Sequence, residues 1–225
     1  MKRLRIVAEG HSEERFCKRI LIPYLANFEV FASVSKIETS SLRNRPDVRF
    51  KGGLPSYAHL KKDILNYLRG DSSSELRVTS FVDFFHLPSD FPGIKTMPNS
   101  DKDAQICHLE KSFRDDIDDA RFLPYIQKHE FEAFLFVDIE RLRMLYPSHL
   151  AKIARIAKGA IGLAPEDVNG GDLTSPSNRI MGEIPEHRRN KPNAVSVLEK
   201  IGLPNIRSQC PRFNAWVSML EKLAT

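Results

Sequence analysis

The feature that most constrains the fold lies at the start of the chain, where a strand pattern ends in a carboxylate and is followed by a helix pattern. Residues 3–8 alternate, are rich in aliphatic side chains and lead into Glu9 and a glycine, which predicts a strand and a turn. Apolar residues then recur at helical spacing over 12–27. Ser12 is the expected N-cap, because its hydroxyl can accept a hydrogen bond from the first helical turn. This order predicts that the strand delivers Glu9 to its carboxyl end.

The alternation of strands and helices continues through the first two thirds of the chain. Further strands are expected at 28–38, 76–85 and 121–128, with helical patterns between them. This order favours α/β architecture: a Rossmann-like, mainly parallel sheet of about four strands, flanked by helices on both faces. The later part of the chain shows short helical patterns and loops rich in Gly, Pro and Asn. We therefore expect an α/β domain over 1–148 and a mostly helical C-terminal extension over 149–225 packed on it.

Composition and charge narrow the class of protein. The chain has 225 residues, of which 41% are hydrophobic and 28% charged, and its formal net charge is +5. These values are typical of a globular protein rather than a disordered or fibrous one. The best apolar run, at 131–137, is interrupted by Glu132 and is far shorter than a membrane span. The first residues lack the apolar core of a signal peptide. We expect a cytoplasmic protein with no membrane partner.

Acidic residues follow three of the predicted strands. Glu9 ends the first strand, Asp83 lies at the end of the third, and Glu130 and Glu132 follow the fourth, while Glu13 lies four residues after Glu9. In an open parallel sheet, ligands bind beyond the carboxyl ends of the strands. Carboxylate oxygens, completed by water and substrate phosphates, are the ligands that Mg²⁺ prefers. The pattern predicts a Mg²⁺ (or Mn²⁺) site for phosphoryl transfer; the alternative is that these acids are solvated or cap helices.

The histidine and cysteine patterns do not indicate zinc. His129 begins the sequence His-Glu-Phe-Glu, but no histidine stands four residues later, so the zinc-protease motif is absent. His129 alone leaves three roles open: a metal ligand, a general base, or a hydrogen-bonded, half-buried side chain. Cys17, Cys107 and Cys210 lie far apart and are odd in number. We therefore expect buried thiols rather than disulfide bonds or a zinc knuckle.

Basic residues lie in two regions that could flank the carboxylates. Most of the net positive charge falls within 179–225, and a second basic stretch precedes a Gly-Gly pair near residue 52. Positive charge beside a metal site suits a polyanion such as nucleic acid, since phosphate contacts dominate its affinity. The alternative is an ordinary solvated surface. The expected phosphate-binding residues are Arg49, Lys51, Arg179, Arg188 and Lys191.

Several motifs resemble those of known families. The sequence Val7 to Glu14 resembles the first motif of the Toprim domain, and the spacing Glu9-x-x-x-Glu13 is the form found in the overcoming-lysogenization-defect (OLD) nucleases. Val82-Asp83-Phe84-Phe85 resembles the Toprim Asp-x-Asp motif, and Glu130-x-Glu132 resembles a later acidic motif. Over nearly its full length, the chain resembles a bacterial family with a domain of unknown function and a Toprim-like start. The motifs shared with that family include Lys51-Gly52-Gly53, the segments 82–88 and 121–133, Pro176-Ser177-Asn178-Arg179 and the segment 210–216.

The resemblance implies a Mg²⁺-dependent nuclease or a related phosphotransferase. It implies that Glu9 and Glu13 bind metal or transfer protons, that Asp83 binds metal, and that the later acidic pair supplies the remaining charge. Two positions depart from the expected motifs. Phe85 stands where the second Asp of Asp-x-Asp belongs, and Asn178 stands where a lysine is expected. In the absence of that lysine, Arg179, Lys191 or Arg188 would have to neutralise transition-state charge.

The resemblance further implies the effector of an anti-phage defence system, gated by a separate ATPase of the ABC or AAA type. The chain itself has no Walker motif, so any ATP hydrolysis must come from another polypeptide. The alternative is a catalytically degenerate, Toprim-like regulatory module that binds nucleic acid or the ATPase. Nucleotidyl transfer and hydrolysis of small phosphoesters would use the same carboxylates, and a homo-oligomer stays open.

Overall fold

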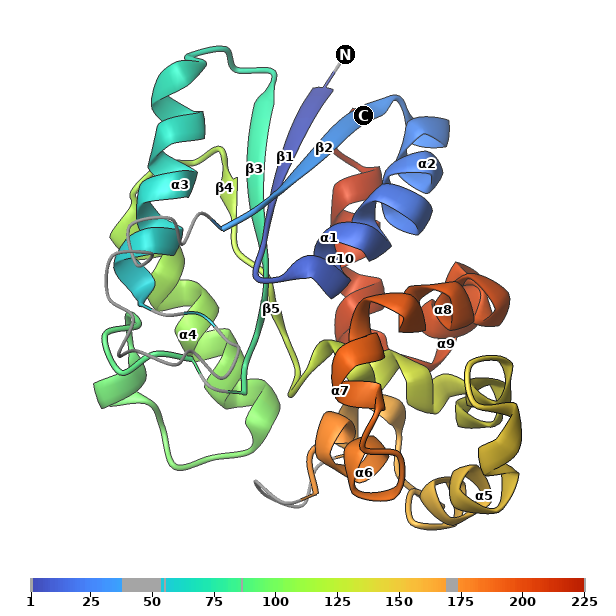
Figure 1. The fold of residues 1–225 in the computed structure, drawn as a ribbon. Coiled ribbons are helices and arrows are strands. Elements are labelled where there is room, and N and C mark those ends of the chain that lie inside the picture. Colours follow the sequence, from blue (N-terminus) through green and yellow to red (C-terminus); the bar gives the residue numbers. More distant parts are fainter. Residues whose placement is uncertain (1, 38–53, 55, 86, 169–173, 225) are drawn as a thin grey trace, which may run out of the picture.

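The computed structural model describes residues 2–37, 54, 56–85, 87–168 and 174–224 (Figure 1). Its centre is a five-stranded sheet in which every pairing is parallel, with the order β2-β1-β3-β4 and with β5 paired to β3. The expected fold class, a mainly parallel sheet flanked by helices with a helical C-terminal part, is confirmed. The strands are β1 (Lys2–Ala8), β2 (Val30–Lys36), β3 (Leu76–Asp83), β4 (Phe122–Leu123) and β5 (Ile126–Gln127).

The strand order reverses next to β1. The chain passes from β1 outward to β2 on one side and then returns past β1 to β3 on the other. In the shared register, Ile6 of β1 lies opposite Val34 of β2 and Thr79 of β3. The helices that follow β1 and β2 therefore leave the sheet on opposite faces, which opens a crevice at the carboxyl ends of β1 and β3. The fold itself thus marks this edge as the place for a ligand.

Helices cover both faces of the sheet, with α3 and α4 on one face and α1, α2 and α10 on the other (Figure 1). The remaining helices α5 to α9 extend the second side. The helices are α1 (His11–Phe16), α2 (Ile22–Leu25), α3 (Tyr57–Gly70), α4 (Lys102–Ile117), α5 (Leu150–Lys158), α6 (Pro176–Glu183), α7 (His187–Asn190), α8 (Val195–Ile201), α9 (Leu203–Gln209) and α10 (Pro211–Glu221).

Aromatic side chains join the early and late parts of the chain in one core. Phe16 of α1 is fully buried, and its ring centroid lies 5.6 Å from that of Phe131 and 5.9 Å from that of Phe213 in α10. Trp216 stacks on Tyr125 with their centroids 4.3 Å apart. Because such large side chains dominate core energetics, the C-terminal helices are packed firmly against the sheet and hold the segments that line its carboxyl edge.

Two expected elements differ in the structure because of proline. The helix expected at 12–27 is divided into α1, a π-helical turn at Cys17–Leu21 and α2. Pro23 lacks the N–H that a regular helix would bond four residues back, which favours such an irregular turn. The strand expected at 121–128 is likewise split into β4 and β5, with Pro124 between them.

The structure also differs from the predicted N-cap role of Ser12 and from the predicted burial of one cysteine. The N-cap position of α1 is Gly10, with no side-chain cap, so Ser12 lies inside the helix. Cys17 and Cys210 are buried as expected, but Cys107 on α4 is exposed. Across the described ranges, none of the helices combines the length and apolar character that crossing a membrane requires.

Candidate functional site

Hydrogen bonds from backbone N–H groups position the carboxylates of Glu9 and Asp83 at the switch point, the place beside β1 where the strand order reverses. The N–H of Glu9 continues the β1 ladder by donating to the carbonyl of Phe81 (3.0 Å). Glu9 Oε2 accepts a hydrogen bond from the Asp83 N–H at 2.9 Å, and Asp83 Oδ2 accepts one from the Phe131 N–H at 3.2 Å. Asp83 Oδ1 is out of contact with solvent and has no hydrogen-bond partner within the described part of the chain. Asp83 therefore presents one unsatisfied acceptor at this edge.

The first turn of α1 adds Glu13, which is 7% exposed. The turn between β1 and α1 is tight, because an added Cβ on Gly10 would lie only 2.9 Å from Glu13 Oε2. A residue without a side chain at position 10 thus leaves room for the Glu13 carboxylate beside the strand end. With this turn between them, the spacing of four residues brings the carboxylates of both Glu9 and Glu13 to the end of β1.

Glu130 is held by the N-terminus of α6. Its carboxylate accepts hydrogen bonds from the Ser177 N–H (2.8 Å), the Ser177 hydroxyl (2.9 Å) and the Ser175 hydroxyl (3.3 Å). The helix dipole and the free N–H groups of a first turn favour a negative charge in this place. Glu130 therefore fastens the helical extension to the carboxyl edge of the sheet in addition to contributing charge.

Glu132 pairs with Lys191, which among the described residues predicted to bind phosphate is the one that lies at the carboxylates. Lys191 Nζ lies 2.9 Å from Glu132 Oε1, and the Glu132 side chain is 7% exposed. Burial alone would lower the pKa of Lys191, but the charges of Glu132, Glu130 and Asp83 outweigh it and hold the pKa above its usual value. Lys191 is therefore a permanent cation beside the acids.

The acids strongly disfavour one another's ionised forms. Burial, with added repulsion from Glu132 and Glu130, raises the pKa of Glu9 to about 7 despite the hydrogen bond from Asp83. Burial and the charge of Glu9 raise the pKa of Glu13 to about 8. Burial, followed by the charges of Glu9 and Glu13, raises the pKa of Asp83 well above its usual range. The structure thus gathers all five predicted carboxylates into one electrostatic unit, in which burial and mutual repulsion favour the protonated forms of Glu9, Glu13 and Asp83.

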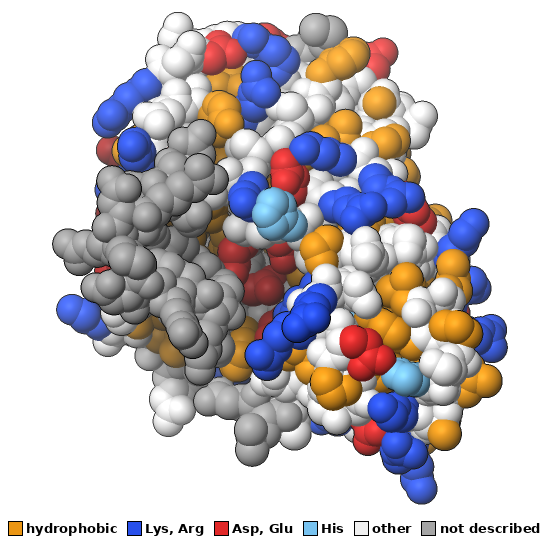
Figure 2. Space-filling model, viewed as in Figure 1, with side chains coloured by type: hydrophobic (Ala, Val, Ile, Leu, Met, Phe, Trp, Pro, Cys, Tyr) orange, Lys and Arg blue, Asp and Glu red, His pale blue; other side chains and the backbone are white. Residues whose placement is uncertain are grey.

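The donor chemistry of this unit fits a hard cation. Figure 2 shows acidic side chains in a hollow where β1 and β3 end in the view of Figure 1, with Lys and Arg side chains around it. The donors are carboxylate oxygens, and Asp83 Oδ1 has no hydrogen-bond partner in the described part of the chain. Among the described residues, no three or more acidic, histidine or cysteine side chains are arranged to hold a metal ion by themselves. Carboxylate oxygens are the kind of donor that Mg²⁺ prefers, and a Mg²⁺ site typically combines one or two carboxylates with several waters.

His129 lies apart from the acidic unit electrostatically. Burial lowers its pKa to about 4, and the charges that act on it most are those of Lys128 and Lys102. The imidazole is therefore neutral at physiological pH. Its backbone is in the left-handed region, with φ of 64°, and its carbonyl accepts a hydrogen bond from the Phe85 N–H at 2.9 Å. This turn points the chain from β5 toward Glu130.

The other predicted phosphate-binding residues have different surroundings. Arg179 donates to the carbonyl oxygens of Thr174 (2.7 Å) and Gly159 (2.8 Å), so it stabilises the loops around α6. Arg188 is exposed on α7. Arg49 and Lys51 lie outside the described residues.

Comparison with known proteins places the chain in a family. The profile of a family described as a domain of unknown function (DUF4276) matches residues 8–221. The chain belongs to the DUF4276 family. The match spans Glu9, Asp83, Glu130 and Lys191, so the whole acidic unit lies within the DUF4276 domain. A search of curated proteins found no match.

Two similar solved structures are of the C-terminal region of the OLD protein from Xanthomonas campestris pv. campestris. One is 13% identical, with 97% of this chain and 98% of that chain covered and a TM-score of 0.39. The other is 14% identical, with 97% of each chain covered and a TM-score of 0.37. Because both TM-scores are low, the site of this DUF4276 chain is interpreted from its own residues.

Proposed function

We propose that this DUF4276 protein is a Mg²⁺-dependent phosphodiesterase that acts on nucleic acid and has a Toprim-like core. The observation that carries the proposal is the acidic unit at the carboxyl ends of β1 and β3, where Asp83 Oδ1 has no hydrogen-bond partner among the described residues and Lys191 is a neighbouring cation. Buried acids whose ionised forms repel one another are stabilised by a divalent cation, and such strongly perturbed groups mark functional sites.

We assign a different role to each residue of the unit. Glu9 and Asp83 would hold Mg²⁺, which when bound supplies charge that polarises a phosphate and favours attack by water. Glu13, whose pKa of about 8 lies near physiological pH, can take up and release a proton. Lys191, which lies beside Glu132, would bind the substrate phosphate and stabilise its developing charge. Glu130 keeps α6 against this edge.

The test combines metal binding with cleavage. Calorimetry with Mg²⁺ and Mn²⁺, and assays on supercoiled plasmid and single-stranded RNA, are run on the wild type, Glu9→Gln and Asp83→Asn. We expect both variants to lose metal binding and to slow cleavage by at least on the order of 10³-fold. Asp115→Asn, which removes an exposed carboxylate on α4, serves as the control. Metal binding retained in both variants would place the metal elsewhere.

A second candidate is a degenerate module that binds nucleic acid or an ATPase without cutting. Phe85 favours it, because the motif resemblance expects a second aspartate there and a phenyl side chain has no oxygen with which to bind a metal. A wild type that binds neither Mg²⁺ nor Mn²⁺ would support this candidate. In either case we propose a separate ABC- or AAA-type ATPase as the partner and a role in anti-phage defence, on the strength of the motif resemblance alone.

Gly10→Ala tests whether the position of Glu13 matters. The backbone at Gly10 is extended, so alanine can adopt it. The new methyl group would displace Glu13 Oε2 from its place 2.9 Å away. We expect Mn²⁺ affinity to fall roughly 10-fold, while the thermal unfolding midpoint changes little. Gly182→Ala on α6, where an added Cβ meets nothing within 4 Å, should leave the affinity unchanged, and equal behaviour of the two variants would contradict the idea.

A further inference from the structure

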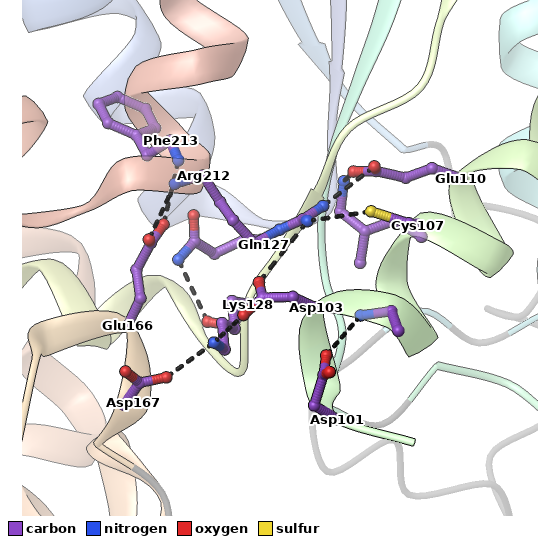
Figure 3. Close-up of polar contacts among 12 residues, drawn as sticks. Asp101, Asp103, Cys107, Glu110, Gln127, Lys128, Glu166, Asp167, Arg212 and Phe213 are labelled. Carbon is purple, nitrogen blue, oxygen red and sulfur yellow. Dashed lines mark hydrogen bonds and ion pairs between the residues drawn. The ribbon is translucent and has the colours of Figure 1, made fainter. Parts of the chain in front are cut away.

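A lysine outside the acidic unit joins two distant segments beside it. The Lys128 side chain follows β5, is 10% exposed and has its Nζ 2.6 Å from Asp103 Oδ2 on α4 and 2.7 Å from Asp167 Oδ1 on the 3₁₀ turn η8 (Pro165–Asp167). Figure 3 shows Lys128 between these two carboxylates. The ammonium group thus forms a bridge, which we call the Lys128 clasp, between α4 and η8 and fixes the end of β5 to both.

Neighbouring contacts make this junction stiff. Arg212 at the start of α10 pairs with Glu110 of α4, at 3.0 Å. Glu166 of η8 accepts hydrogen bonds from the N–H groups of Arg212 and Phe213, both at 3.0 Å (Figure 3). α4, η8 and α10 are therefore already tied to one another. The clasp connects the strand end to this fixed frame.

The strand end needs such a restraint because the next residue is strained. His129 has φ of 64°, a conformation that residues with side chains seldom adopt unless their surroundings hold them. Beyond it, Glu130 enters the N-terminus of α6, and the Phe131 N–H donates to Asp83. A strand end that is free to move would therefore shift the acids at both of these contacts.

We propose that Lys128 is a positioning residue of the acidic unit: through the clasp it holds the left-handed turn at His129 and so sets where Glu130 and Glu132 stand relative to Asp83. The proposal rests on the proposed metal-binding function. It deepens that function by assigning the support of the acids to a residue that is not one of them. Support of this kind typically changes metal affinity by 10- to 100-fold.

Lys128→Met gives a test in which electrostatics and positioning predict opposite signs. Removing a positive charge near a cation site would strengthen Mn²⁺ binding if charge alone mattered. Positioning predicts instead that Mn²⁺ affinity, measured by calorimetry, falls by roughly 10- to 100-fold. The fold should survive, because Asp103 and Asp167 are 50% and 54% exposed and water can solvate them when the lysine is gone. Lys128→Arg keeps the charge and should restore much of the affinity.

A second readout needs no metal. In the metal-free Lys128→Met protein, amide hydrogen exchange should accelerate in the segment 129–134 and stay unchanged in β1 and β2. The matched control is Lys111→Met, which breaks an exposed ion pair with Asp115 within α4, the helix that also carries Asp103 of the Lys128 clasp. Unchanged or tighter Mn²⁺ binding by Lys128→Met, or faster exchange spread over the whole chain, would overturn the proposal. A wild type that binds no Mn²⁺ would contradict the proposed function. Amide hydrogen exchange in the segment 129–134 would still show whether Lys128 positions that segment.

Discussion

Replacing Lys191 with methionine is expected to slow phosphodiester cleavage by roughly 10²- to 10³-fold while Mn²⁺ binding is retained or tightened. Lys191 is the cation beside the acidic unit, and its charge is held by Glu132, 2.9 Å away. A substrate phosphate brings negative charge close to buried acids, and this charge grows in the transition state. Losing the cation therefore affects turnover, whereas metal binding by Glu9 and Asp83 loses only a repulsive neighbour.

The Lys191 result needs a control for the acid left behind. Without its partner, the buried Glu132 becomes an uncompensated charge, which alone would destabilise the fold by about 3 kcal/mol. The double variant Lys191→Met/Glu132→Gln removes that charge, and Glu132→Gln alone is its reference, so a double variant of equal stability that cleaves more slowly than Glu132→Gln would assign the loss to Lys191. Lys18→Met breaks an exposed ion pair with Glu14 on the other side of α1 and should cleave normally. Full activity in Lys191→Met would limit Lys191 to pairing with Glu132.

The part of the site formed by local order could be predicted from the sequence. β1 alternates before a buried run at its end and β3 is buried over most of its length, and Glu9 and Asp83 stand at their ends because parallel strands finish at one edge of a sheet. Glu13 follows from helical spacing after the same turn. These three positions depend on residues within about one helical turn of a strand end, and there the sequence pattern is sufficient.

The part formed by distant contacts could not be predicted. Whether Arg179, Arg188 or Lys191 stands near the acids depends on how α6 and α7 pack on the sheet, and the structure brings Lys191 there. The hydrogen bond from the Ser177 N–H to Glu130 joins residues 47 positions apart, and no sequence pattern near either residue indicates it. The helix α6 lies outside the helical patterns that the sequence predicts in this part of the chain, at 150–160, 194–201 and 213–223, although Ser175 followed by Pro176 is a typical N-cap and first helical residue.

Raising the pH should destabilise the metal-free protein. The pKa of Glu9 is raised from 4.5 to about 7 and that of Glu13 to about 8, so the folded state binds these protons more tightly than the unfolded chain does. The resulting stabilisation is complete below pH 4.5 and is lost as the pH rises through 7 and 8. Between pH 6.5 and 8.5 we expect the free energy of unfolding to fall by roughly 3 kcal/mol.

This pH window separates the acids from other titrating groups. Burial lowers the pKa of His129 and His187 from 6.5 to about 4, which makes stability rise with pH, but only below about pH 6.5. Burial raises the pKa of the Cys17 thiol above its usual 9.0, so this thiol contributes only above that pH. Within the window, a decline in stability therefore reports on the acidic unit, in which the pKa values of Glu9, Glu13 and Asp83 are all raised.

Urea unfolding of the chelator-treated protein at several pH values measures the decline. Glu9→Gln should reduce the slope and be more stable than the wild type at pH 8.5, because an uncharged amide replaces a buried carboxylate. Glu140→Gln, which changes an exposed acid, should retain the full slope. Saturating Mg²⁺ should flatten the wild-type curve, since a cation that binds only the folded state favours ionised acids there. A metal-free protein whose stability is constant or rises from pH 6.5 to 8.5 would mean that these acids are charged and paired without a metal, which would leave the site little reason to bind one.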